Sequence, residues 1–172
     1  MNETLQVLER LRAEWMQQEG RRARGGVASL SGFHFQLLST LRERVLAWCS
    51  RPAVERGVSS VIDEFLSDAL SVAPDGTVVI AQAKRVLRTA GVAHALDELW
   101  RIDELARKAT PELAPRLEYR VRTAHNAVPD VSATIAAWKP EEGADDAALA
   151  SFLARTRAEV LGDPMEELLA TL

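Results

Sequence analysis

The segment from Gly57 to Ala81 constrains the fold most, because its pattern is that of a β-hairpin. Residues Gly57 to Val72 are rich in β-branched side chains and show no helical stripe, and the apolar run Thr77 to Ala81 follows after a turn. Asp75 and Gly76 lie in this turn, and both residue types tolerate the positive φ that a tight hairpin turn requires. We therefore predict two antiparallel strands joined at this turn.

Helices are predicted on both sides of the hairpin, where apolar residues recur every three or four positions. They are expected at Glu3 to Gln18, Leu30 to Trp48, Gly91 to Lys108, Asp130 to Trp138, Ala144 to Leu161 and from Asp163 onward. The third helix should bury one face, which comprises Val92, Ala95, Leu96, Leu99, Ile102 and Ala106. The fifth helix should bury Leu149, Phe152, Leu153 and Val160.

A third strand is predicted from Arg116 to Thr123, where apolar and charged side chains alternate. Its apolar side comprises Leu117, Tyr119 and Val121, and its half-exposed side comprises Arg116, Glu118, Arg120 and Arg122. The order helix, β-hairpin, helix, strand predicts an α/β fold. We expect an N-terminal amphipathic helix (1–20), a core (25–139) and C-terminal helices (144–172) that continue beyond the chain or pack on a partner.

Composition narrows the class of protein. The 172 residues are 47% hydrophobic, which is enough for one domain core. Cys49 is the only cysteine, so an internal disulfide is excluded, and four-ligand zinc spacing is absent. The sequence has no apolar run of bilayer-spanning length, and its start reads as a charged helix. We therefore expect a cytoplasmic protein that does not contact a membrane.

The charge distribution is uneven. A formal net charge of −4 argues against a protein that coats nucleic acid through bulk electrostatics. Positive residues nevertheless gather in two clusters, one at Arg21, Arg22 and Arg24 and one at Lys84, Arg85 and Arg88. The simpler interpretation of either cluster is a solvated surface, and for the first cluster nothing else in the sequence indicates a site.

Polar residues meet across the predicted hairpin. Strand alternation puts Glu64 and Asp68 on one face of the first strand, and Gln82 and Lys84 on one face of the second. Placing a lysine at the end of a buried apolar run costs free energy, because a charged group is poorly solvated there. This suggests that Lys84 has a functional role. Carboxylate oxygens and a backbone carbonyl suit a hard ion such as Mg²⁺, which activates water against a phosphodiester. Lys84 would then position that water or stabilise developing charge.

Simpler explanations of these residues stay open. Asp68 and Lys84 could form only a cross-strand ion pair, which contributes little at an exposed edge. Asp63 would replace Glu64 if the register of the strand slipped by one residue.

The arrangement resembles a known superfamily. Asp68, a turn, and then Gln82-Ala83-Lys84, set in a hairpin, helix and strand, resemble the PD-(D/E)xK (restriction-endonuclease-like) superfamily in its QxK variant. Ser31 to Gln36 and Glu64 to Asp68 are similar to the Gly-x-x-x-Gln and Glu-x-x-x-Asp elements of the N-terminal dsDNA endonuclease domain of bacterial anti-phage effectors, including those of CBASS. The resemblance spans about Gly25 to Ala124.

This resemblance implies a Mg²⁺-dependent endonuclease, with Mn²⁺ as a possible substitute, that acts on double-stranded DNA in anti-phage defence. Activation would come through assembly, as a homo-oligomer or with a sensor or ATPase subunit. Asp68 and the Ala83 carbonyl would hold the metal with Glu64, Lys84 would act on the nucleophile, and Gln82 would be a neutral ligand or orient water. The supporting and DNA-contacting residues would be Gln36, Arg85 and Arg88.

Two other functions fit the same sequence. In the first, the nuclease fold is catalytically degenerate and serves as a scaffold or oligomerisation subunit, with its terminal helices packed on a ring-forming ATPase or a second copy. In the second, the chain is an unrelated α/β adaptor.

Overall fold

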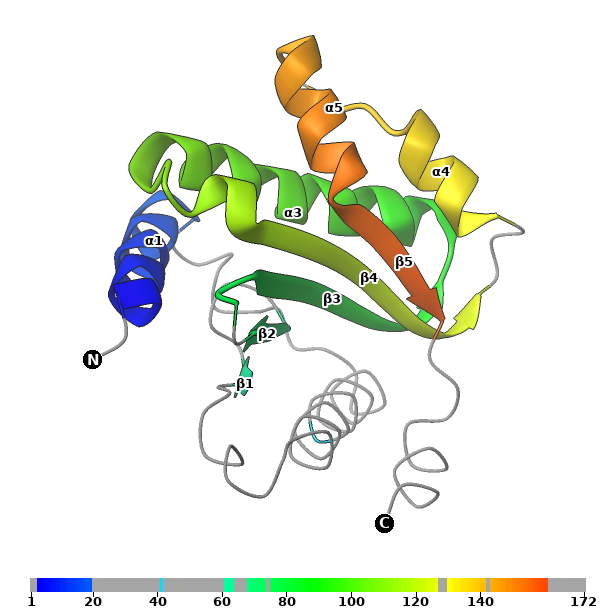
Figure 1. Ribbon diagram of the computed structural model, residues 1–172. Coiled ribbons are helices and arrows are strands. Elements are labelled where there is room, and N and C mark those ends of the chain that lie inside the picture. The colour runs from blue at the N-terminus through cyan, green and yellow to red at the C-terminus, as the bar shows by residue number, and fades with distance from the viewer. Residues whose placement is uncertain are drawn as a thin grey trace.

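The computed structural model describes residues 3–19, 41, 61–63, 68–73, 75–126, 130–141 and 143–160. In these ranges the chain is a mixed α/β structure, as predicted, with a five-stranded sheet in the order β1-β2-β3-β4-β5 (Figure 1). The strands are β1 Val61–Asp63, β2 Ala69–Val72, β3 Val78–Leu87, β4 Leu117–Asn126 and β5 Thr156–Val160. The helices are α1 Glu3–Glu19, α3 Thr89–Ala109, α4 Val131–Ala137 and α5 Asp146–Ala154, with a 3₁₀ turn, η2, at Ala114–Arg116.

The predicted hairpin is present as β2 and β3, which pair antiparallel with Ala69 opposite Ala81. Gly76 adopts a φ of 82°, and its amide donates to the Ala73 carbonyl at 2.9 Å. The Asp75 carboxylate accepts a hydrogen bond from the Thr77 amide at 2.9 Å. This bond favours the ionised carboxylate and lowers the pKa of Asp75 below its usual value.

The prediction of one long first strand from Gly57 to Val72 is wrong. The chain instead forms two short strands, β1 and β2, which pair antiparallel with each other so that Ile62 lies opposite Leu70 and Asp63 opposite Ala69. A β-branched composition favours extended backbone but does not say where that backbone reverses. Alternation along one strand therefore cannot place Glu64 beside Asp68, and Glu64 lies outside the described residues.

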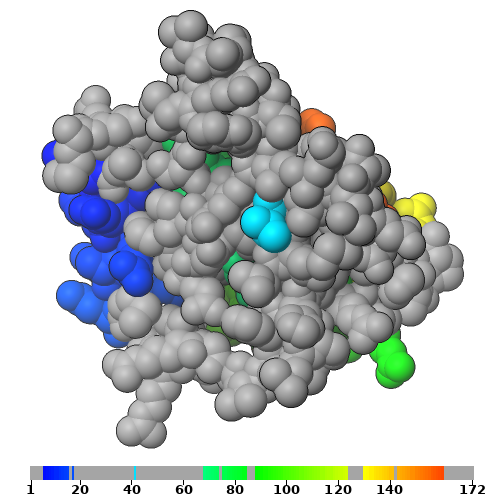
Figure 2. All heavy atoms as spheres, turned by 90° about the horizontal axis from the view of Figure 1, so that it is seen from below, coloured from blue at the N-terminus to red at the C-terminus, as the bar shows by residue number. Residues whose placement is uncertain are grey.

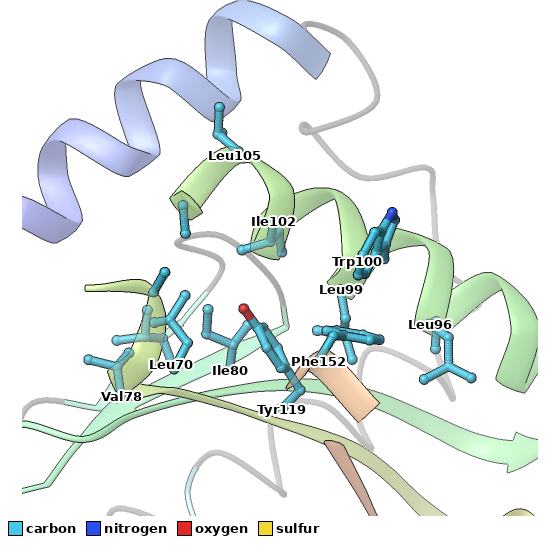
Figure 3. Close-up of a cluster of buried hydrophobic side chains, with 14 of the residues drawn as sticks. Leu70, Val78, Ile80, Leu96, Leu99, Trp100, Ile102, Leu105, Tyr119 and Phe152 are labelled. Atoms are coloured by element: carbon cyan, nitrogen blue, oxygen red, sulfur yellow. The ribbon is translucent and has the colours of Figure 1, made fainter. Parts of the chain in front are cut away.

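The helix α3 connects β3 to β4, and these two strands run parallel. Parallel neighbours require a crossover, and α3 supplies it while packing against one sheet face (Figures 1 and 3). All six residues of its predicted inward face are buried. They meet apolar side chains of the sheet such as Leu70, Ile80 and Tyr119 (Figure 3).

The predicted N-terminal helix is present as α1, and it packs on α3. Val7, Leu8 and Leu11 are buried in the common core, and Leu105 extends from α3 toward α1 (Figure 3). In the space-filling view α1 forms one edge of the molecule (Figure 2). The apolar face of α1 is therefore covered by its own chain.

The C-terminal region departs from the prediction. The spacing predicts a helix from Ala144 to Leu161, but α5 ends at Ala154 and Thr156–Val160 forms β5, which pairs parallel with β4. Phe152 is buried as predicted, whereas Val160 is 58% exposed rather than inward. The cause is tertiary, because backbone pairing with β4 outweighs the helical spacing of these side chains. The helix predicted from Asp163 onward falls outside the described residues.

The short helix α4 begins at the predicted cap, since the Asp130 side chain accepts a hydrogen bond from the Ala133 amide at 2.9 Å.

Within the ranges given above, the protein has no helix of the length and apolarity needed to cross a membrane.

A buried carboxylate joins three of these elements. Asp103 on α3 is fully buried, and its Oδ1 atom accepts from the Tyr119 hydroxyl and from Arg155 Nη2, both at 2.8 Å. Arg107 Nε donates to Oδ2 at 3.0 Å. Arg155 also donates to the carbonyls of Ala114 and Leu117, at 2.8 and 3.0 Å. Burial raises the pKa of Tyr119, so its hydroxyl keeps its proton and donates to Asp103.

We predict that Asp103→Ala lowers the free energy of unfolding by about 3–5 kcal/mol, because it leaves the Tyr119 hydroxyl and two guanidinium groups without their anion. Asp97→Ala on the same helix, at a partly exposed position, is the matched control and should change stability by less than about 0.5 kcal/mol. Urea unfolding of both variants measures this difference. Equal losses in the two variants would show that Asp103 does not hold these elements together.

Candidate active site at the end of the hairpin

An acid and an amine meet beside the hairpin, as predicted. Lys84 Nζ lies 4.0 Å from Asp68 Oδ2, and the two side chains are 36% and 18% exposed. Lys84 belongs to β3, and Asp68 comes directly before β2. Continuing the register of β2 and β3 by one step puts Asp68 opposite Gln82, on the sheet face that also carries Ile80 and Lys84. The pair is therefore partly exposed, just past the point where the pairing of β2 with β3 ends.

A backbone hydrogen bond fixes the carboxylate. The Ala83 amide donates to Asp68 Oδ2 at 2.8 Å. The N–H and C=O groups of one strand residue point to the same edge, so the Ala83 carbonyl also lies on the Asp68 side of β3. The pairing of β2 with β3 ends at Ala69 and Ala81. The backbone of β3 at Ala83 therefore faces the Asp68 side chain and not a strand residue.

Gln82, the residue opposite Asp68 in the continued register, has a buried amide oxygen. Gln82 is 5% exposed, and its Oε1 atom has no hydrogen-bond partner in the described part of the protein. A buried polar atom without a partner costs about 1–3 kcal/mol, so such an atom calls for a water or a cation. Gln82 Oε1, the Asp68 carboxylate and the Ala83 carbonyl are the hard oxygen donors that Mg²⁺ prefers. These residues fit a divalent cation.

The site lies near the C-terminal ends of parallel strands, where open α/β sheets bind ligands. Lys84 is the register partner of Thr123 on β4, and α3 begins at Thr89, soon after β3 ends. Thr123 is buried and lies on the same sheet face as Lys84. Sequence reasoning did not single out Thr123, because its position beside Lys84 follows only from the parallel pairing.

The remaining site predictions have different outcomes. Glu64 and Gln36 fall outside the described residues, and so does the side chain of Arg85. Arg88 is exposed and directly precedes α3. Within the ranges covered, no three His, Cys, Asp or Glu side chains gather as a metal-binding group. A cation held by described residues would therefore depend on neutral oxygens as well as on Asp68.

The charged side of β4 is less exposed than predicted. Glu159 on β5 binds two of its arginines, accepting from Arg120 Nε at 3.0 Å and from Arg122 Nε at 2.7 Å. Arg120 also pairs with Glu118, and Arg122 is buried. The prediction of a half-exposed charged face is therefore wrong for Arg122, because β5, which was predicted as helix, brings Glu159 against it. The acidic partner also makes these arginines weak candidates for binding phosphate.

No protein-family model, curated protein or solved structure matches this chain.

We predict that Gln82→Met raises the free energy of unfolding by about 1 kcal/mol, because it replaces an unpartnered buried oxygen with an apolar group of similar length. Gln17→Met, at an exposed position on α1, is the control and should stay within about 0.5 kcal/mol of the unaltered protein. Thermal or urea unfolding in the presence of EDTA checks both. A clear loss of stability in Gln82→Met would mean that the amide group as a whole makes stabilising hydrogen bonds in solution.

Proposed function

We propose that this chain is a metal-dependent DNA endonuclease of the PD-(D/E)xK type, with Asp68, Gln82 and Lys84 as its reacting site. The observation that carries the proposal is the approach of the Lys84 ammonium to the Asp68 carboxylate at 4.0 Å, together with the unpartnered buried oxygen of Gln82, the residue opposite Asp68 when the register is continued. A purely structural ion pair would leave that buried oxygen unexplained. A metal-dependent phosphodiesterase site uses oxygen ligands for its cation and positive charge beside the phosphate.

Each residue would have a separate role in this reaction. The Asp68 carboxylate, Gln82 Oε1 and the Ala83 carbonyl would hold Mg²⁺ or Mn²⁺, with Glu64 as a further ligand. Such a cation polarises the phosphate and lowers the pKa of bound water. Lys84 carries a compact charge with three donors, which suits it to orient the attacking water and to stabilise charge on the phosphate oxygens.

The arrangement of elements supports the proposal in a second way. The order hairpin β2–β3, helix α3 and strand β4 is the order expected of a restriction-endonuclease-like core.

The exposed Arg88 follows β3 directly and would contact the DNA backbone beside the site, together with Arg85. Gln36 remains the proposed supporting residue. A role in anti-phage defence, with activation by a sensor or ATPase subunit or by self-assembly, rests on the sequence resemblance alone.

A degenerate scaffold is the second candidate. It is favoured by the neutral Gln82, which gives a cation a weaker field than a carboxylate would. The packing of α1 counts against one form of it, because the apolar face that would dock on a partner is buried against α3. A cleavage assay separates the two functions.

We predict that the full chain degrades plasmid DNA in Mg²⁺ or Mn²⁺, and that EDTA abolishes the reaction. Asp68→Asn and Lys84→Gln should each lower the rate by about a hundredfold or more, because each removes a group that acts on the reacting phosphate. Asp97→Asn and Lys108→Gln on α3 make the same charge changes away from the site and should retain activity. If all four variants cleave alike, or if the full chain does not cleave, the nuclease proposal fails.

A further inference from the structure

We propose that β5 pairs edge to edge with β5 of a second copy of this chain, so that the sheets of the two copies join antiparallel. This surface is separate from the Asp68 site, and the inference holds whether or not that site cleaves DNA. β5 is the last strand of the sheet, and in the described part of the chain it has β4 on one side and no strand on the other (Figure 1).

The backbone of β5 directs hydrogen-bonding groups to this outer edge. The Tyr119 amide of β4 donates to the Arg155 carbonyl at 2.9 Å, so Arg155, the residue before β5, directs its carbonyl toward β4. Successive residues of a strand direct their N–H and C=O groups to opposite edges. By this alternation, the residues of β5 that direct both groups away from β4 are Thr156, Ala158 and Val160.

Side chains at the outer edge are accessible. Val160 is 58% exposed, and Arg157 is exposed and has no ion-pair partner among the described residues. A strand edge with unpaired backbone groups pairs readily with another chain unless its charged side chains oppose that chain. The charges of β5 therefore decide which partner its edge accepts.

A second copy of β5 is the partner that these charges fit. When two β5 strands run antiparallel with Ala158 opposite Ala158, every outward-directed residue lies opposite another one, and each such pair exchanges two backbone hydrogen bonds. Arg157 then lies opposite Glu159 of the second copy, and the two-fold symmetry makes this contact occur twice. These pairs fall at the non-hydrogen-bonded positions, where cross-strand side chains come closest.

Other registers of the same two strands are less favourable. Sliding one strand by a single residue leaves outward-directed backbone groups opposite groups that face β4, so the ladder cannot form. Sliding it by two residues restores the backbone match but places Arg157 opposite Arg157 of the second copy, or Glu159 opposite Glu159 of the second copy. Like charges directly opposite each other are destabilising, so the charges of β5 select the register centred on Ala158.

Glu159 can accept the additional guanidinium. Its carboxylate is 35% exposed, and its two oxygens accept from Arg120 Nε and from Arg122 Nε. A carboxylate has about four acceptor sites, so Glu159 can bind Arg157 of the second copy without releasing either arginine of its own chain.

Sedimentation equilibrium of the full chain tests the pairing. The contact is small, because each copy contributes one five-residue strand, so we expect a dimer with a Kd of about 10 µM. Arg157→Glu should raise this Kd about tenfold or more, because it places a second carboxylate opposite Glu159 of the other copy. Arg12→Glu makes the same charge change on the exposed side of α1, across the molecule from β5, and should leave the Kd within about twofold (Figure 1).

A cysteine cross-link checks the register. In a Cys49→Ser background, Ala158→Cys should form a disulfide-linked dimer on oxidation, because position 158 lies opposite itself with a Cα separation of about 5.5 Å, which a disulfide spans. Ala147→Cys, at an exposed position on α5, is the matched control and should cross-link far more slowly. Circular dichroism and thermal unfolding show whether each variant is folded.

Three results would overturn the inference. The first is a chain that stays monomeric at about 100 µM, and the second is a dimer that Arg157→Glu leaves unchanged. The third is a dimer in which Ala158→Cys cross-links no faster than Ala147→Cys. None of these results bears on the nuclease proposal, which the plasmid assay decides separately.

Discussion

The difference in length between β2 and β3 is the constraint on which the site depends. β3 is ten residues long and β2 only four, so β3 continues past its antiparallel neighbour while it stays paired with β4. The Ala83 amide beyond that point donates to the side chain of Asp68. Because β2 is short, the Ala83 amide pairs with the side chain of Asp68, and this hydrogen bond holds the carboxylate in place. The alternation of β3 puts Gln82 and Lys84 on the same sheet face as Asp68.

Asp103 and Asp68 both pair with basic side chains, but their surroundings suit different roles. Asp103 is fully buried and accepts from Tyr119, Arg155 and Arg107, so it joins α3 to β4 and to the start of β5. Asp68 is partly exposed, and Lys84 Nζ lies 4.0 Å from its Oδ2 atom. The first arrangement is closed and suits a structural role. The second is partly exposed, and Gln82, the residue opposite Asp68 in the continued register, has a buried oxygen without a partner in the described part of the chain.

The sequence predicted elements whose pattern is local and failed where distant pairing decides. The turn at Gly76, the buried face of α3 and the cap at Asp130 follow from residue preferences within a few positions, and the structure confirms them. Residues 156–160 have helical spacing but join β4 as a strand, which no local pattern reveals.

Asp103 lies four residues after Leu99 and three before Ala106, so its spacing could have placed it on the buried face. Its partner Arg155 could not have been identified from spacing. For the site, the pairing of Asp68 with Lys84 was predictable from the hairpin, whereas the position of Thr123 required the parallel register.

The central claim is that Asp68, Gln82 and Lys84 form one pocket for a cation and a phosphate. Crystals of the full chain grown with a short DNA duplex and Mn²⁺ would test it most directly, because anomalous scattering locates the manganese ion. The account predicts an ion within about 2–2.6 Å of oxygens from Asp68 and Gln82, with a phosphate oxygen on Lys84. An ion bound elsewhere, with the Asp68 carboxylate still held only by Ala83 and Lys84, would contradict it.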